Sequence, residues 1–514
     1  MTARNSMPLA AVIVVLTLIV VVPAPHAQDA PLWRETVSAK VESYDYSTFG
    51  SLLVQLKTGL LALDPETGKH LWSRLDVSGY GVLSGTSFGV AETAAGRTVV
   101  DLESGQDRWK LSSLGFSSVK DIVLLASRDL MLVFGETTEN RHVMVAARYE
   151  SGEVVWKQPG LYSAPALASK AHKIKYRRWL SDTEHTVVLD PTDDGLIRLD
   201  LRSGQLLWRI AKTELDGEED FSALFAADGR IYGTYGKRLL AIDAEKGKVL
   251  WIRKEKFPTP VFQMASTSQG LLLRGAYNLD GNGRASWHPY LALLDPATGA
   301  TKWTTEKSEF QARSSFLLED NAIVIALEKG IATYDLASGN VLTSVTMPEF
   351  AGGENPCCLQ RFEGGRLLVW SSQNLRMFDQ SGKPLYSIYL KPPGSSLLAK
   401  VASTALVVAA GAASYAAASP GGRYYAPTGN PVLTARYKAT VNAERFSHIF
   451  TEAADSDAKP TRFSLVRIDK ETGKETGRLW FTDRSPSFRL DPATGVAVVF
   501  EDNAFFAMRF GPVS

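Results

Sequence analysis

The chain has 514 residues, 45% of them hydrophobic and 22% charged, which is an ordinary composition for a globular protein. Its 56 Lys and Arg residues balance 55 Asp and Glu residues, so no overall field attracts it to nucleic acid or anionic lipid. The only two cysteines are adjacent in sequence, which excludes a fold held together by a network of disulfides.

The first element in chain order is an apolar run, residues 8–22, that follows Arg4 and leads to Pro23 and Ala27. A basic residue, an apolar stretch and a short polar end are typical of a secretory signal peptide. The run is short for a segment that crosses a bilayer, so cleavage is favoured over a retained anchor. We therefore expect residues 1–27 to be removed, leaving an exported periplasmic or extracellular protein without a stable membrane span.

The main feature of the sequence is a turn motif that first appears after the apolar run 60–63. Asp64 opens the turn, Gly68 closes it, and Trp72 follows four residues later. The Asp64 carboxylate can accept hydrogen bonds from the free amides of the turn, and Gly68 can adopt the positive φ that the turn needs. We therefore expect two strands joined by a tight turn, with Trp72 as a large apolar plate on the second strand.

The same turn occurs eight times between residues 64 and 382, and successive first positions are 37 to 52 residues apart. Six of the eleven tryptophans hold the same position in it, which chance does not produce. Arg148 replaces the aspartate of the third copy, and Thr343 and Tyr386 replace the tryptophan of the last two. A ninth turn follows, with Trp480 displaced. The motif positions after the first copy are Asp101, Gly105, Trp109, Gly152, Trp156, Asp200, Gly204, Trp208, Asp243, Gly247, Trp251, Asp295, Gly299, Trp303, Asp335, Gly339, Asp379, Gly382, Asp469 and Gly473.

Between the turns, short segments rich in Val, Ile, Leu and Tyr indicate strands, for example 231–235, 239–242 and 249–252. A repeat of about 45 residues with four antiparallel strands is a propeller blade. One such sheet cannot bury its own faces, whereas neighbouring blades in a ring bury each other's. The tryptophan would fill the gap between blades and donate its indole N–H to a neighbouring carbonyl. The motif residues are therefore expected to be structural, not catalytic.

The pattern A-x-D-x-x-[TS]-G-x-x-x-W occurs at 62–72 and, with Lys246 at the Thr/Ser position, at 241–251. It resembles the tryptophan-docking repeat of quinoprotein (PQQ-type) β-propellers. That family includes PQQ-dependent alcohol dehydrogenases and the non-enzymatic outer-membrane assembly scaffold BamB. The resemblance covers roughly residues 50–390 and implies an all-β fold, a single β-propeller of eight four-stranded blades over residues 31–392. It is specific for the fold and unspecific for activity.

The C-terminal part, residues 393–514, is less regular. Residues 397–418 are rich in alanine, with apolar residues at helical spacing, and predict a packed helix. A degenerate blade and a weak membrane contact are the alternatives. Beyond a Gly- and Pro-rich linker, the ninth turn, a further turn at Asp491–Gly495 and the strands 496–501 and 504–510 either enlarge the ring or form an appended β module.

Cys357 and Cys358 are a candidate vicinal disulfide if the protein reaches an oxidising compartment. The resemblance adds that quinoprotein alcohol dehydrogenases hold such a pair against their cofactor, near the start of the ring. Here the pair lies between the seventh and eighth copies. A PQQ enzyme also needs a divalent cation with oxygen ligands and a carboxylate base, and no local motif assigns either. No catalytic, cofactor-binding or metal-binding residue is therefore assigned.

One basic stretch, Lys170–Trp179, carries five positive charges and could contact an acidic partner or a headgroup, although a solvated loop or strand edge is the better interpretation. We expect an exported, non-catalytic β-propeller that acts as a protein-interaction scaffold or binding protein in the cell envelope, with an envelope protein as partner. The alternative is a PQQ- and Ca²⁺-dependent alcohol or sugar dehydrogenase with a separate electron acceptor.

Overall fold

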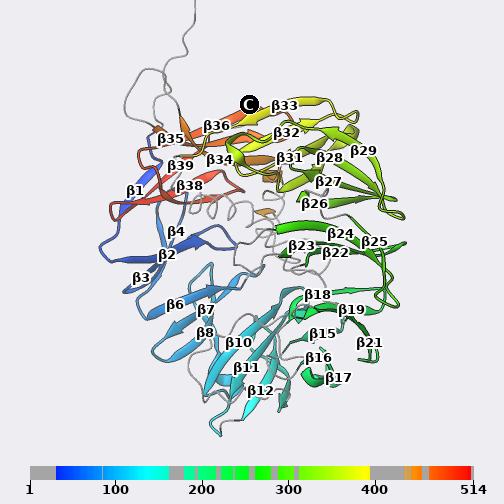
Figure 1. The fold of residues 1–514 in the computed structure, drawn as a ribbon. Coiled ribbons are helices and arrows are strands. Elements are labelled where there is room, and N and C mark those ends of the chain that lie inside the picture. Colours follow the sequence, from blue (N-terminus) through cyan, green and yellow to red (C-terminus); the bar gives the residue numbers. More distant parts are fainter. Residues whose placement is uncertain are drawn as a thin grey trace, which may run out of the picture.

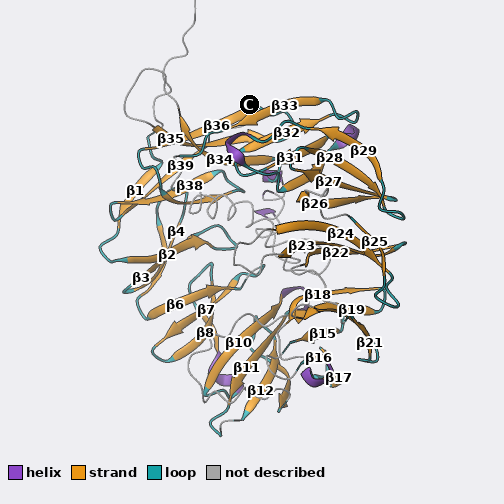
Figure 2. Cartoon of the chain, in the orientation of Figure 1, coloured by secondary structure: helices purple, strands orange, loops and turns teal. Residues whose placement is uncertain are grey.

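The structure is a computed structural model that describes residues 30–510 with gaps. Among the described residues no helix has seven or more residues, and strands dominate (Figure 2). The 3₁₀ helices with described bounds are η1 (Leu111–Leu114), η2 (Ala126–Arg128), η3 (Lys212–Leu215), η4 (Ala351–Gly353) and η5 (Glu363–Gly365). The gaps are residues 84, 140, 161–178, 191–194, 216–220, 236–237, 254–260, 279–286, 306–311, 394–434, 437–438, 440–441 and 454–461.

Ten antiparallel sheets lie side by side in a ring (Figure 1), nine of them with four described strands and one with three. Within a sheet the first strand lies toward the centre of the ring and the last toward the rim. The first five sheets are β2–β5 (Val41–Tyr46, Leu52–Leu56, Gly59–Leu63, His70–Arg74), β6–β9 (Val77–Val82, Phe88–Thr93, Gly96–Asp101, Asp107–Lys110), β10–β13 (Ser118–Leu125, Leu130–Glu136, His142–Ala147, Val154–Pro159), β14–β17 (Trp179–Leu180, Thr186–Leu189, Leu196–Asp200, Leu206–Ile210) and β18–β21 (Phe221–Ala227, Arg230–Tyr235, Arg238–Asp243, Val249–Ile252).

The sixth to tenth sheets continue round the ring to the first. They are β22–β25 (Val261–Thr267, Gly270–Asn278, Trp287–Leu294, Thr301–Thr304), β26–β29 (Ala312–Glu319, Ala322–Leu327, Gly330–Asp335, Val341–Thr346), β30–β33 (Cys358–Arg361, Leu367–Trp370, Asn374–Phe378, Pro384–Tyr389), β34–β36 (Phe446–Ala453, Arg462–Asp469, Glu475–Phe481) and β37–β39 (Ser487–Asp491, Val496–Glu501, Ala504–Arg509) with β1 (Trp33–Thr36).

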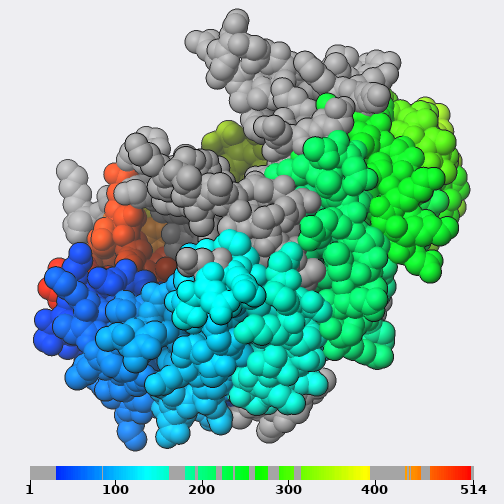
Figure 3. Space-filling model, turned by 90° about the horizontal axis from the view of Figure 1, so that it is seen from below, coloured from blue at the N-terminus to red at the C-terminus, as the bar shows by residue number. Residues whose placement is uncertain are grey.

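The ring is closed by strands from the two ends of the sequence. β1 pairs antiparallel with β39, with Trp33 opposite Ala507 and Thr36 opposite Ala504. The N-terminal and C-terminal parts of the described chain, blue and orange-red, accordingly lie side by side in Figure 3. The tenth sheet therefore takes its rim strand from the beginning of the chain.

The expectation of eight blades is wrong, because the ring has ten sheets. The repeated turn motif lies between the third and fourth strands of a sheet. The tenth sheet has no such turn, because its fourth strand is β1. The ninth sheet has the turn Asp469–Gly473, but its tryptophan is displaced and it lies in the less regular C-terminal region. Of the two alternatives for that region, the strands of residues 446–509 enlarge the ring.

The hydrophobic core lies between neighbouring sheets. Each of the ten junctions has its own buried cluster, including the junction of the tenth sheet with the first, where Val496 and Phe505 meet Leu52 and Leu63. A middle strand such as β4 is buried at every residue, because sheets cover both of its faces, and this explains its continuous apolar sequence. The rim strand β5, by contrast, has no buried residue.

Two expectations lie outside the described residues: the signal peptide of residues 1–27 and the alanine-rich helix of 397–418. Within the part of the chain that the structure describes, no helix is both long and apolar enough to cross a bilayer.

Candidate functional site

The aspartates of the repeat hold the turns through their carboxylates. Asp64 Oδ1 accepts hydrogen bonds from the amides of Glu66 at 2.8 Å and Thr67 at 3.0 Å, and Gly68 has a φ of 72°. At Asp243, the amide of Lys246 donates to the carboxylate and helps to lower its pKa. Amides of the turn also donate to Asp101, Asp200, Asp295, Asp335, Asp379 and Asp469.

Each docking tryptophan lies on the turn of the next sheet. The Trp72 indole covers Gly105, where a Cβ atom would lie 2.6 Å from Trp72 Cδ2, and Trp72 Nε1 donates to the Leu102 carbonyl at 3.2 Å. The joint therefore requires glycine both for its φ of 72° and for the close approach. The same contacts join Trp109 to Gly152 and Tyr149, Trp156 to Gly204 and Leu201, Trp208 to Gly247 and Ala244, Trp251 to Gly299 and Pro296, and Trp303 to Gly339 and Leu336.

A seventh tryptophan, Trp33 of β1, docks in the same way and was missed in the sequence. Its ring covers Gly68, and its Nε1 donates to the Pro65 carbonyl at 2.8 Å. No turn precedes Trp33, because the rest of its sheet lies at the other end of the chain. Spacing is the signal that could have found it: Trp33 precedes Gly68 by 35 residues, much as Trp72 precedes Gly105 by 33.

Among the described residues, three of the ten junctions lack a docked tryptophan, and one of these, between the ninth and tenth sheets, has no turn between third and fourth strands to receive it. Val345, not Thr343, lies against Gly382 at the junction of the seventh and eighth sheets. At the next junction Tyr386 covers Gly473, and its hydroxyl donates to the Lys470 carbonyl. The tyrosine thus supplies both the aromatic plate and the donor that an indole supplies elsewhere.

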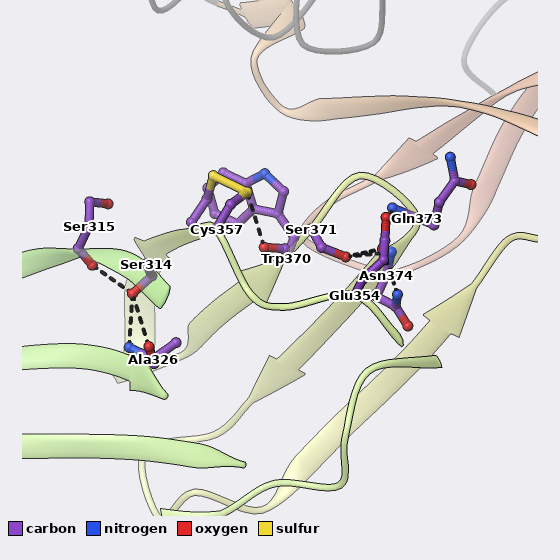
Figure 4. Close-up of a disulfide and its surroundings, with 10 residues drawn as sticks. Ser314, Ser315, Ala326, Glu354, Cys357, Trp370, Ser371, Gln373 and Asn374 are labelled. Carbon is purple, nitrogen blue, oxygen red and sulfur yellow. Dashed lines mark hydrogen bonds between the residues drawn. A yellow bond between two sulfur atoms is a disulfide. The ribbon is translucent and has the colours of Figure 1, made fainter. Parts of the chain in front are cut away.

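Cys357 and Cys358 are joined by a vicinal disulfide at the start of β30, on the inner side of the eighth sheet (Figure 4). The Cys357 amide donates to the Trp370 carbonyl at 2.9 Å, and the Ser315 amide of β26 donates to the Cys357 carbonyl at 3.3 Å. The disulfide therefore lies where the innermost strands of the seventh and eighth sheets meet. Cys357 is exposed and Cys358 is half-buried.

Near the disulfide, the Glu354 carboxylate holds a turn together (Figure 4). Its Oε2 accepts hydrogen bonds from Ser371 Oγ at 2.5 Å, the Gln373 amide at 3.0 Å and Asn374 Nδ2 at 2.8 Å. Asn374, which is 1% exposed, also bonds both main-chain groups of Ala351. With three donors on one oxygen, this carboxylate fixes the local structure and is a poor candidate for a catalytic base.

Two cationic side chains, Arg467 and Lys470, act on His448 in the ninth sheet. Lys470 Nζ lies 5.1 Å from the centre of a Trp370 ring, and burial lowers the pKa of Lys470. Burial lowers the pKa of His448 to about 3, and the positive charges of Arg467 and Lys470 add to the effect. His448 is therefore neutral at physiological pH.

A cavity of about 400 Å³ opens between the third and fourth sheets. Arg128 and Arg148 reach it from the third sheet, and His185 and Arg202 reach it from the fourth. The other lining residues are Leu130, Val155, Glu184 and Leu201. One of these lining residues, Arg148, is the arginine that replaces the motif aspartate in the third copy of the repeat. The basic stretch itself is outside the described residues except for Trp179.

The quinoprotein alternative requires a divalent cation beside the quinone. Among the described residues, no three His, Cys, Asp or Glu side chains come together as metal ligands. The aspartate carboxylates of the repeat accept hydrogen bonds from turn amides, and the Glu354 carboxylate accepts three hydrogen bonds. Among the residues that the structure describes, none is therefore assigned to that cation.

The sequence model of the family described as "Outer membrane protein assembly factor BamB" matches residues 21–210 and 95–342, together more than half of the chain. Similar solved structures include BamB from Moraxella catarrhalis, with 15% identity over 68% of this chain and 98% of that one, and a TM-score of 0.31. They also include the quinohemoprotein alcohol dehydrogenase ADHIIG from Pseudomonas putida HK5, with 11% identity over 75% of this chain and 81% of that one, and a TM-score of 0.31. A third is the computationally designed Ika8 protein, with 11% identity over 69% of this chain and 98% of that one, and a TM-score of 0.32. No curated protein matches the chain significantly.

Proposed function

Because the chain belongs to the family of the outer membrane protein assembly factor BamB, we propose that it is a non-catalytic protein-interaction scaffold of the cell envelope. The observation that carries the proposal is the way the ring is built. Seven tryptophans and one tyrosine dock on the turn of the next sheet, so the turns are held in fixed relative positions. A rigid disc with many surface turns is suited to binding proteins.

Export is part of the proposal. The N-terminal apolar run supports it, and so does the disulfide between Cys357 and Cys358, because disulfides persist in oxidising compartments. We propose that the mature protein begins near residue 28 and works in the periplasm or outside the cell, with an envelope protein as its partner.

The alternative, a PQQ-dependent dehydrogenase, rests on one observation: the vicinal disulfide lies at the start of β30, the innermost strand of the eighth sheet. One experiment separates the two functions. The mature protein is incubated with PQQ and Ca²⁺, its absorbance is recorded after gel filtration, and dye-linked oxidation of alcohols and sugars is measured. The scaffold predicts no stoichiometric quinone and no turnover. Quinone retained at one equivalent together with substrate oxidation would replace the scaffold with the enzyme.

The positive test of the scaffold is crosslinking in intact cells, followed by purification of the mature protein under denaturing conditions. We expect the same one or few envelope proteins in repeated experiments. They should be lost when Trp156→Ala loosens the joint of two neighbouring sheets, whereas Leu75→Ala, at a rim side chain that is 81% exposed, should retain them. Crosslinks no different from those of an unrelated exported protein would refute the proposal.

A further inference from the structure

We propose that the cavity between the third and fourth sheets binds a small ligand that bears a phosphate group. The cavity is formed where the turns of two neighbouring sheets meet, and three guanidinium groups and one imidazole line it. Guanidinium groups bind phosphate and carboxylate through paired hydrogen bonds, and several of them around one opening favour an anion.

The charge of the lining fits a dianion. Three arginines and Glu184 give a formal net charge of 3 − 1 = +2, with His185 left out of the count. A phosphate monoester carries about −1.5 to −2 charges near pH 7, which matches this lining better than a single carboxylate does. Asp129, beside the cavity, offsets part of the charge of Arg148, because its Oδ2 lies 3.4 Å from Arg148 Nη1.

The basic groups are held in place from both sides. Arg128 donates to the main-chain carbonyls of Thr183, at 3.3 Å, and Glu184. Carbonyl oxygens orient the guanidinium without neutralising its charge. Across the opening, Arg202 Nη2 lies 3.0 Å from His185 Nε2. A ligand that contacts Arg148 and Arg202 would therefore bridge two sheets and stabilise their junction.

Arg148 is the departure from the repeat that creates this charge. The corresponding residue is aspartate in the other copies, where it accepts hydrogen bonds from turn amides. In the third sheet, the Asp129 carboxylate lies beside this turn instead, with its Oδ2 3.4 Å from Arg148 Nη1. The aspartate position is thus occupied by a cation, which lies next to a carboxylate from another turn of the same sheet. A purely structural turn does not require that cation.

The floor of the cavity is apolar. Leu130 is 7% exposed and Leu201 is 2% exposed, and both belong to the cluster that packs the third sheet against the fourth, with Val155 half-buried beside them. A volume of about 400 Å³ lies within the range of small-ligand sites, roughly 300–1,000 Å³. The ligand is therefore expected to combine a phosphate with a small apolar group.

Phenyl phosphate is the first probe, measured by calorimetry and by the shift in melting temperature of the full mature protein. We expect Arg148→Asp to weaken binding at least about ten-fold, because it replaces attraction by repulsion. This variant should fold, since the fifth and seventh sheets already combine two such aspartates, Asp228 with Asp243 and Asp320 with Asp335. Arg148→Gln provides a second, uncharged variant.

The matched control is Arg141→Asp, which makes the same change in net charge at a side chain that is 73% exposed on the same sheet. It should bind phenyl phosphate within about two-fold of the wild type, since long-range effects between exposed charges are screened by salt. Equal affinities of the wild type and Arg148→Asp, or equal weakening by Arg141→Asp, would overturn the proposal.

Three further probes identify the source of the anion. Benzoate that binds as tightly as phenyl phosphate would overturn the assignment to phosphate. Inorganic phosphate that binds more weakly than phenyl phosphate supports a contribution from the apolar floor. Vesicles containing phosphatidic acid that bind the wild type but not Arg148→Asp, compared with phosphatidylcholine vesicles, would assign the phosphate to a lipid headgroup. No binding to phenyl phosphate or to these vesicles would refute the site, whatever the result of the crosslinking.

Discussion

Replacing Gly105 by alanine tests whether the tryptophan joints hold the ring together. The new Cβ would lie 2.6 Å from Trp72 Cδ2, and the backbone would keep a φ of 72° that L side chains rarely adopt. The left-handed backbone costs about 1 kcal/mol. Displacing Trp72 adds about 1–3 kcal/mol, and losing its hydrogen bond to Leu102 adds about 1 kcal/mol. We therefore expect the free energy of unfolding to fall by about 3–5 kcal/mol.

Gly229→Ala is the matched control, because Gly229 has a φ of 70° and no atom within 4 Å of its added Cβ. It should lose only about 1 kcal/mol, for the backbone alone. Urea unfolding, followed by tryptophan fluorescence and far-UV circular dichroism, measures both variants, and coincident transitions are needed for a two-state comparison. Equal losses in the two variants would mean that the docked indole adds nothing, and the reasoning about the joints would fail.

Three more predictions concern the closure of the ring and the C-terminal sheets. Trp33→Ala should lower the free energy of unfolding by about 3–5 kcal/mol, and hydrogen exchange should show lost protection in β1 while β20 stays protected. Burial and two nearby cations lower the pKa of His448 to about 3, so the unfolded chain binds a proton that the folded chain does not. Stability should therefore fall as the pH drops from about 6.5 toward 3, by up to about 1.4 kcal/mol per pH unit, and His448→Gln should flatten this dependence of the urea midpoint. Arg436→Ala removes the guanidinium 2.9 Å from Asp491, whose side chain is 1% exposed, and should cost about 3 kcal/mol in thermal unfolding, whereas Lys329→Ala, in an exposed ion pair, should cost under about 1 kcal/mol.

The family and the β-propeller fold were predicted from the sequence and are confirmed, because the evidence for them is local. The turn from Asp64 to Gly68 and the tryptophan after it lie within nine residues, and their hydrogen bonds depend mainly on their own sequence. Such a motif identifies each blade that contains it. It says little about blades that do not.

The number of sheets and the candidate site depend on distant residues. Trp33 has no motif around it, and only its pairing with β39 shows that it completes a sheet. Arg148 was visible as a departure from the repeat. Its role depends on Arg128 and Asp129 in another turn and on His185 and Arg202 in the next sheet. No spacing rule brings these residues together, because the connections between sheets vary in length.

The pairing of β1 with β39 gives the order of synthesis a physical consequence. Trp33 is made first and its partner Ala507 comes 474 residues later. The entropy of closing so long a loop grows slowly, by about 0.6 kcal/mol per doubling of length, but contacts this distant form late. Until then the first sheet presents an uncovered apolar face, and a nascent or truncated chain keeps it exposed to chaperones and proteases. Completion of the ring thus reports that synthesis has passed β39.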